Sequence, residues 1–274
     1  MPLENFRNGS LNVRQWGEGA PLLLVHGLGT SSDLWIHQLR PFASRYRVVA
    51  VDLPGFGRTQ RLPGRGDGGD GLSTIVDDLA ELCSRLGGPV HYVGTSMGGF
   101  FGLALALARP GLLRSLVLCN TAARNVISPE IVATRLAALR TSTMDELGEM
   151  VTRQALGPLA SPFLHEWFRE LIARNSPVFY GHYLSVILND FDVTDRLGEI
   201  TLPALVLTGE HDRVISPAHG AELARRLSAG ALHELAGTGH IACAEQPEAF
   251  NRAVLDFLAG VDSVDAGQPT ETRS

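Results

Sequence analysis

Three residues far apart in this chain have the types that nucleophilic catalysis needs: Ser96, Asp212 and His240. Serine is a weak nucleophile, so a histidine must take its proton and a carboxylate must orient that histidine. Ser96 is the centre of Gly94–Gly98 (GTSMG), a sharp strand-to-helix turn that would expose its hydroxyl. The alternative is a glycine-rich turn that merely contains a serine. We expect Ser96 to be the nucleophile of an acyl transfer.

The base and the acid follow the nucleophile in chain order. His240 comes just after the strand-like run 231–235, and Asp212 comes just after the run 204–208. Both would therefore lie at the carboxyl ends of strands, where open α/β sheets bind their ligands. Glu210 is a second candidate for the acid, but Asp212 is preferred because it is further into the loop.

Other residues of suitable type have simpler explanations. His211 lies beside the acid, His219 falls in a helical pattern, and His233 falls in a strand pattern, which favours structural or surface positions. A second place for the acid, after the strand-like run 115–119, holds Asn120, which cannot carry a negative charge.

Two backbone N–H groups are expected to hold the oxyanion of the acyl transfer. One belongs to Met97, the residue after the nucleophile, and the other to Leu28 in the loop after the run 21–26. His26 is interpreted as a histidine that holds this loop. Asp52 is interpreted as a carboxylate that fixes a turn, because no second metal ligand is close in sequence. The sequence predicts no metal site and no cofactor.

Short apolar runs alternate with helical patterns, as in an α/β fold built from βαβ units. Most runs are continuous rather than alternating in polarity, which is typical of strands buried on both faces of a parallel sheet. An antiparallel hairpin is possible over 6–16. We therefore predict an eight-stranded, mostly parallel sheet with helices on both faces. The expected strands are 21–26, 47–51, 90–93, 115–119, 204–208 and 231–235, and the expected helices are 73–86, 97–108, 217–227 and 247–258.

Residues 123–190 break this alternation, because they contain helical patterns only and six of the eighteen aromatic residues. We expect them to form a helical cap over the sheet, which sets substrate choice but is not needed for the triad to assemble. Trp167, Phe179 and Tyr183 are the candidates for substrate contact. The expected domain division is a core of 1–122 and 191–262, the cap of 123–190 and a disordered tail of 263–274, with a flexible surface loop at 62–71.

Composition limits the function classes. The net charge is −6 with no long run of one sign, which argues against a nucleic-acid partner. Cys83, Cys119 and Cys243 are odd in number and far apart, so neither a disulfide framework nor a metal site is suggested. The N-terminus lacks the pattern of a signal peptide, and the longest apolar stretch, 97–108, is too short to cross a bilayer. We expect a cytoplasmic protein without a membrane partner.

The chain resembles the α/β-hydrolase superfamily across about residues 6–260. Five motifs carry this resemblance, in the order HGLG, VDLPGFG, GTSMGG, GEHD and GTGH. Within this superfamily, the chain is similar to the 3-oxoadipate enol-lactonase and carboxylesterase group in three segments: 113–125, Ser176-Pro177 and 192–203. This resemblance implies an ester or lactone opened by the triad without a cofactor. The chain departs from enol-lactonases at 26–29, where they often have NSLG, and at 52–57, where they tend to have DxRGHG.

Three other activities stay open. The hydrolases that cleave C–C bonds of meta-cleavage products share Ser-Met-Gly-Gly, but Thr95 and Ile241 stand where they usually carry Asn and Trp. A cofactor-free perhydrolase would use the same triad. A receptor-like hydrolase fold would bind a ligand without turnover, and activity on a generic aryl ester would exclude that reading. Dehalogenases and epoxide hydrolases of this fold use an aspartate nucleophile, which Ser96 argues against.

Overall fold

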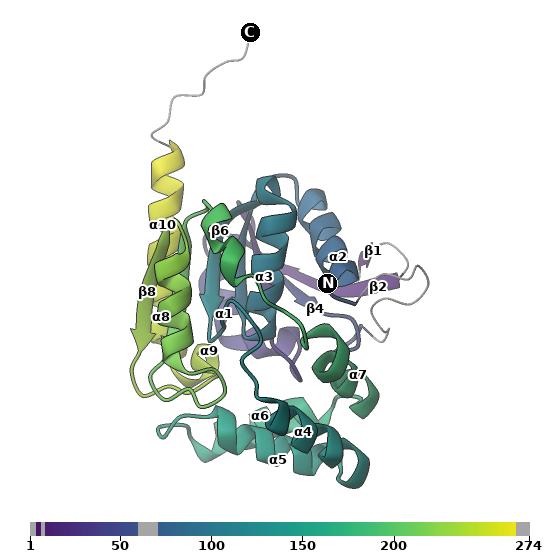
Figure 1. Cartoon of the computed structure of the whole chain (residues 1–274). Helices are drawn as coiled ribbons and strands as arrows, with labels where there is room; N and C mark the ends of the chain where they lie inside the picture. The colour runs from purple at the N-terminus through teal and green to yellow at the C-terminus, as the bar shows by residue number, and fades with distance from the viewer. Residues whose placement is uncertain (1–3, 7–8, 60–70, 267–274) are drawn as a thin grey trace.

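The computed structural model describes residues 4–6, 9–59 and 71–266, and its centre is an eight-stranded sheet in the order β1-β2-β4-β3-β5-β6-β7-β8 (Figure 1). β1 and β2 pair antiparallel with each other and β2 with β4, whereas every pair from β4 to β8 is parallel. The expected mostly parallel sheet is confirmed. The strands are β1 Glu4–Phe6, β2 Gly9–Trp16, β3 Pro21–Val25, β4 Arg47–Asp52, β5 Val90–Thr95, β6 Leu113–Cys119, β7 Ala204–Gly209 and β8 Gly230–Leu235.

Helices cover both faces of the sheet because side chains alternate along each strand. In β3, Leu23 packs into the core under α2, α3 and α8, whereas Leu22 packs into the core under α1 and α10. Each continuous apolar strand therefore contributes side chains to both hydrophobic layers. The helices of this core are α1 Ile36–Ala43, α2 Gly71–Arg85, α3 Met97–Ala108, α8 Pro217–Arg226, the short α9 Ala242–Glu245 and α10 Pro247–Ala266.

Sequence patterns missed two of these helices, α1 and the short α9, and misjudged the end of another. α1 contains Pro41, and a proline inside a helical pattern normally argues against a helix. α10 continues to Ala266, so the disordered tail predicted from 263 is wrong for its first four residues. Just before these four residues, Asp262 accepts a hydrogen bond from Tyr46 Oη at 2.9 Å, a contact that links this end of α10 to the core. The rest of the predicted tail, residues 7–8 and residues 62–70 of the predicted surface loop lie outside the described residues, whereas residue 71, the last of that predicted loop, begins α2.

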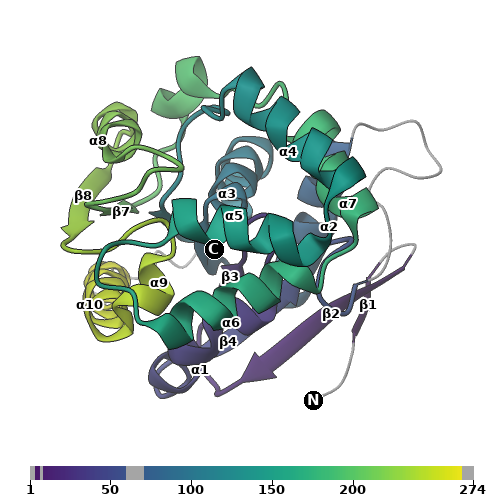
Figure 2. The ribbon, with the colours of Figure 1, turned by 90° about the horizontal axis from the view of Figure 1, so that it is seen from below.

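Four further helices follow β6 and precede β7 in the chain. They lie across the carboxyl ends of the parallel strands (Figures 1 and 2). They are α4 Pro129–Thr141, α5 Met144–Ala155, α6 Pro162–Ala173 and α7 Pro177–His182, followed by a π-helical turn, Tyr183–Ile187. Their starts follow local signals: Ser128, Thr143 and Ser161 each accept a hydrogen bond from a backbone N–H of the first turn. We call residues 123–190 the cap from here on.

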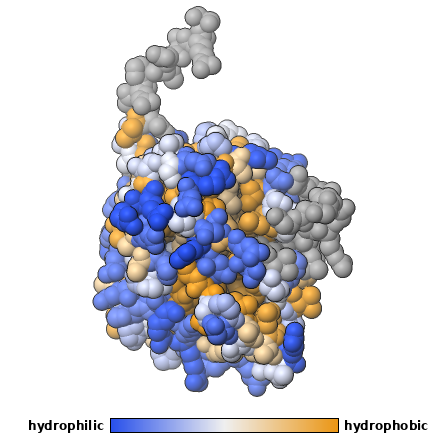
Figure 3. Space-filling model, viewed as in Figure 1, coloured by the Kyte–Doolittle hydropathy of each residue, from blue (hydrophilic) through white to orange (hydrophobic). Residues whose placement is uncertain are grey.

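The outer surface is mixed in character. On the face drawn in Figure 3, apolar residues are exposed in patches among hydrophilic ones. No helix in the described ranges is both long and apolar enough to cross a membrane.

Candidate active site

Ser96 occupies a strained turn between β5 and α3. Its backbone has φ 53° and ψ −119°, a left-handed conformation that costs on the order of 1–3 kcal/mol for a residue other than glycine. The turn is held by Ser96 N, which donates to Cys119 O at 2.8 Å, and by Thr121 Oγ1, which donates to Ser96 O at 2.9 Å. A Cβ at Gly98 would collide with Val25 O, so only glycine allows this close approach. The fold thus maintains the sharp turn that the sequence predicted.

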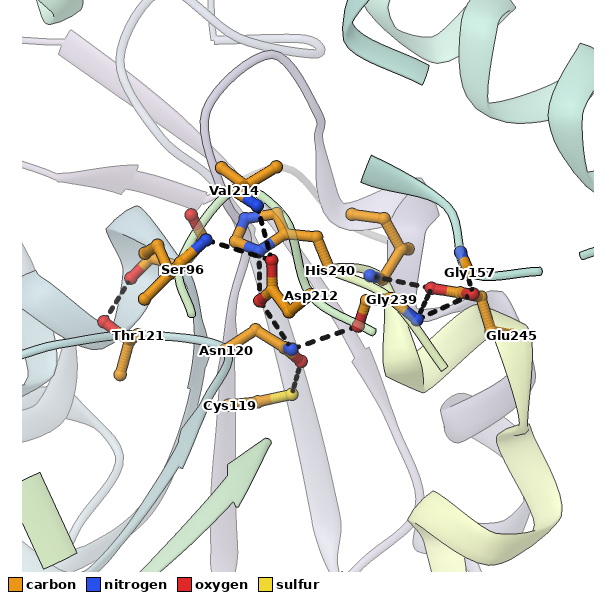
Figure 4. Close-up of polar contacts among 12 residues, drawn as sticks. Ser96, Cys119, Asn120, Thr121, Gly157, Asp212, Val214, Gly239, His240 and Glu245 are labelled. Atoms are coloured by element: carbon orange, nitrogen blue, oxygen red, sulfur yellow. Dashed lines mark hydrogen bonds and ion pairs between the residues drawn. The ribbon is translucent and has the colours of Figure 1, made fainter. Parts of the chain in front are cut away.

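His240 and Asp212 form a buried pair in the structure (Figure 4). His240 Nδ1 lies 2.8 Å from Asp212 Oδ2, so the ring donates this proton and Nε2 remains as the acceptor. The loops after β7 and after β8 bring the two residues together across 28 positions of sequence. Ser96 and His240 line the same cavity. The three residues chosen from the sequence are therefore brought to one place.

The carboxylate of Asp212 is hydrogen bonded at both oxygens. Oδ1 accepts from the backbone N–H of Val214 at 2.8 Å and of Ile215 at 3.0 Å, and Oδ2 also accepts from Asn120 Nδ2 at 2.9 Å. Burial by itself raises the pKa of Asp212, but attraction to His240 and these hydrogen bonds outweigh it, so the pKa lies below its ordinary value. Asp212 is therefore held in its charged form.

Asn120 is the neighbour of Asp212 that sequence reasoning left without a role. It stands where a second acid had been considered, and its own φ is 47°. Its amide donates to Asp212 and, at 3.1 Å, to Gly239 O in the loop of His240. Asn120 therefore links Asp212 to the loop of His240, and no pattern in the sequence could have shown this.

The competing candidates lie in other environments. Glu210 is about half exposed, at 45%, and accepts from Gly237 N at 2.8 Å. His26 is fully buried, and its ring donates to Gly27 O and accepts from Leu53 N, as expected for a residue that holds a loop. Burial lowers the pKa of His26.

Asp52 also has a structural environment. Its carboxylate accepts from Asn12 Nδ2 at 2.6 Å and from the backbone N–H groups of Ser32 and Arg58. These bonds join β2, the 3-10 turn that begins at Ser32 and the turn at Arg58, which agrees with its interpretation as a turn-fixing carboxylate. Within the part of the chain that the structure describes, no three His, Cys, Asp or Glu side chains are grouped as metal ligands would be.

The cavity at Ser96 has a mainly apolar lining. It holds about 630 Å³ of empty space, counting the solvent in its open mouth. Leu28 and Met97, the expected oxyanion residues, line it beside Ser96. A Cβ at Gly27 would lie 3.3 Å from Ser96 Cβ, so the loop of Leu28 passes directly beside Ser96. The cap contributes Ile127, Arg135, Val151, Ala155, Phe168, Tyr180 and Leu188.

The cap aromatics selected from the sequence do not line this cavity. Trp167 is partly buried against the core, and Phe179 packs against the loop at Gly55. Tyr183 is fully buried, and its hydroxyl donates to Pro54 O at 2.8 Å. Their sequence neighbours Phe168 and Tyr180 face the cavity instead. One step along a helix turns a side chain by about 100°, so composition alone could not select the correct face.

The cap is also joined directly to the loop of His240, a contact that the sequence did not predict. His240 N donates to Ala155 O, at the end of α5, at 2.6 Å. Glu245 then accepts from Gly157 N in the cap at 2.7 Å and from the N–H groups of Gly239 and Ile241 on both sides of His240. Burial raises the pKa of Glu245, which these N–H groups offset in part. Glu245 fastens the His240 loop to the cap.

Glu245→Gln is therefore expected to lower kcat by roughly tenfold and the free energy of unfolding by about 1–3 kcal/mol, the cost of unsatisfied buried donors. The amide keeps the shape but turns an NH₂ group toward backbone N–H groups. Steady-state kinetics and urea unfolding measure the two effects. Glu248→Gln, at an exposed position three residues away, is the matched control and should change neither. An unchanged kcat in Glu245→Gln would show that Glu245 does not position His240.

The chain has relatives of known sequence and structure. A sequence model of the family described as alpha/beta hydrolase fold matches residues 20–247. The chain is 30% identical to a protein named carbamate hydrolase RutD from Agrobacterium fabrum, over 89% of this chain and 95% of that one. It is also 30% identical to 2-hydroxy-6-oxononadienedioate/2-hydroxy-6-oxononatrienedioate hydrolase 2 from Pseudomonas putida, over 90% and 91%. The solved enol-lactonase from Burkholderia xenovorans LB400 matches with a TM-score of 0.85 at 28% identity, covering 94% of this chain and 100% of that one. The chain therefore belongs to the α/β-hydrolase fold family.

Proposed function

We propose that this hydrolase cleaves a carboxylic ester or lactone through an acyl-enzyme. The observation that carries the proposal is the pairing of an elbow serine with a histidine whose Nδ1 is held by Asp212, both facing one apolar cavity. Ser96 Oγ attacks the carbonyl carbon while His240 Nε2 takes its proton. The Leu28 and Met97 N–H groups stabilise the oxyanion. His240 then protonates the leaving oxygen and later activates the water that releases the acid.

The names of the relatives do not decide which bond is cleaved. They refer to a carbamate, a nonadienedioate or nonatrienedioate, and an enol-lactone, which are three different chemical groups. An ester or lactone is proposed because an attacking serine and two N–H donors suffice for acyl transfer. The proposed reaction uses no metal or organic cofactor. A cytoplasmic location is part of the proposal and is supported by three buried cysteines with free thiols.

The test combines turnover with covalent labelling of the purified protein. A panel of aryl esters, alkyl esters and lactones is assayed beside a ring-fission product of the meta-cleavage type, and a fluorophosphonate probe is used to label the nucleophile. We expect turnover of esters or lactones and a single mass adduct on the peptide that contains Ser96. Cleavage of the ring-fission product alone would favour the C–C hydrolase. Binding of esters without turnover or labelling would favour the receptor-like reading.

The cap is expected to set the size of the acyl group through Phe168. Its side chain is buried and lines the cavity, whereas Phe163, on the same helix, is 80% exposed. Phe168→Leu should shift the kcat/KM ratio between bulky and small acyl esters by roughly tenfold in favour of the bulky ones. Phe163→Leu is the control and should keep the wild-type ratio. Equal losses for all esters in Phe168→Leu, together with a lower Tm, would mean that Phe168 is structural only.

A further inference from the structure

Arg135 is a charged residue in an otherwise uncharged part of the cavity. It lies on α4 of the cap, its side chain is only 4% exposed, and it lines the same cavity as Ser96. Among the other residues of the lining, only His240 and Tyr180 have an ionisable side chain, and there is no carboxylate. Arginine stays cationic inside proteins, so the cap places a permanent positive charge within the cavity.

The protein supplies neutral partners for this charge. Arg135 Nη2 donates to the amide oxygen Gln154 Oε1 at 2.9 Å, and among the described residues no carboxylate forms an ion pair with it. It also lies near Tyr180, where burial raises the pKa of the phenol and Arg135 offsets this in part, so Tyr180 remains neutral. A buried cation without a counter-charge is costly, because burial removes its hydration and nothing of opposite charge replaces it.

We propose that the missing counter-charge comes from the substrate. The cavity takes an ester or lactone that carries a carboxylate, and Arg135 binds that carboxylate while the scissile carbonyl lies at Ser96. The planar guanidinium matches a carboxylate with two parallel hydrogen bonds, and its remaining donors hold Gln154. Because Arg135 belongs to the cap and Ser96 to the sheet, the anionic end is held on the opposite wall from the reacting end. This inference rests on the proposed function.

A different role for Arg135 would be purely structural. Through Gln154 on α5 and Tyr180 on α7, it connects three helices of the cap. An apolar side chain or a neutral donor would serve such a connection without burying a charge. The two roles differ in what a substitution changes: substrate discrimination in the first, and stability with uniform loss of activity in the second.

The wild-type protein provides the first test. The kcat/KM values for monomethyl succinate, glutarate and adipate are compared with those for methyl esters of the same chains ending in a carboxamide, by titration of the released acid. We expect the anionic ester to be preferred by roughly 10- to 100-fold at the best chain length, mainly through KM, as for a hydrogen bond to a charged group. Equal rates, or a preference for the neutral esters at every length, would overturn the proposal.

Substitutions at Arg135 provide the second test. Arg135→Met should bring the anionic-to-neutral ratio close to one, and Arg135→Lys should retain part of it because the charge stays while the paired hydrogen bonds are lost. Arg140→Met, at an exposed position on the same helix, is the matched control and should keep the wild-type ratio. An unchanged ratio in Arg135→Met, with all esters slowed equally, would assign Arg135 to cap stability. If Arg135→Met does not fold, Arg135→Lys and the wild-type ratio still decide.

Binding separates this inference from the proposed function. Calorimetric titration of Ser96→Ala with monomethyl glutarate should show binding that Arg135→Lys weakens in the same background. This binding could be found while the wild-type protein turns over no ester and is not labelled by the probe. That result would refute the serine hydrolase but would leave the anion site supported. Turnover of neutral esters with no binding preference for the anionic ones would refute the anion site alone.

Discussion

Replacing Ser96 with alanine is expected to lower kcat by roughly 10⁴- to 10⁶-fold while the fold stays intact. Alanine removes the attacking oxygen but keeps Cβ, so the backbone strain at φ 53° is the same in both proteins. The bonds that hold the turn, from Ser96 N to Cys119 O and from Thr121 to Ser96 O, involve the backbone of residue 96 and remain.

The measurement is kcat on the best ester, together with circular dichroism and Tm. Ser142→Ala, at an exposed position that ends α4, is the control and should be fully active and fully labelled by the fluorophosphonate probe. Near wild-type turnover by a correctly folded Ser96→Ala protein, or probe labelling that survives in it, would end the hypothesis that Ser96 is the nucleophile.

Asp212→Asn is expected to lower kcat by about 10⁴-fold, because the neutral amide selects the wrong tautomer of His240. The oxygen of Asn must face the N–H groups of Val214 and Ile215, which leaves its NH₂ group toward His240. The ring then has to accept at Nδ1 and carry its proton on Nε2, where it cannot take the proton of Ser96. Activity is therefore lost although the shape of the side chain is kept.

Glu210→Gln is the matched control, since Glu210 is a carboxylate two residues away that is half exposed and bonded to Gly237 N. It should keep kcat within a few-fold of wild type. If Asp212→Asn left kcat unchanged while Glu210→Gln lowered it strongly, the assignment of the acid would be reversed.

The pH dependence of unfolding gives a second readout for Asp212. The folded pKa of Asp212 lies below its ordinary value of 3.8, so the stability it contributes is present above that pH and is lost as the pH falls through the folded pKa. The stability difference between wild type and Asp212→Asn should therefore be largest near neutral pH and narrow in acid.

Local patterns in the sequence were enough to predict the framework of the site. Continuous apolar runs identified the parallel strands because such strands are buried on both faces. Once the strands were known, Ser96, Asp212 and His240 each followed the carboxyl end of one, and these ends meet at one edge of the sheet. The placement of these residues could be predicted because each depends on its own turn and on a topology that its flanking segments imply.

Tertiary structure alone decided the environment of these residues. Asn120 reaches Asp212 across 92 positions, Glu245 reaches Gly157 across 88, and neither pair has a local signal. The choice of Phe168 over Trp167, and the burial of Arg135, depend on how the cap helices are rotated against the sheet. A sequence shows which residues a helix carries, but the rotation is set by packing against elements distant in the chain. The sequence therefore determined which residues are available for chemistry. The packing of the cap against the sheet decided what surrounds them, because that packing depends on long-range contacts only.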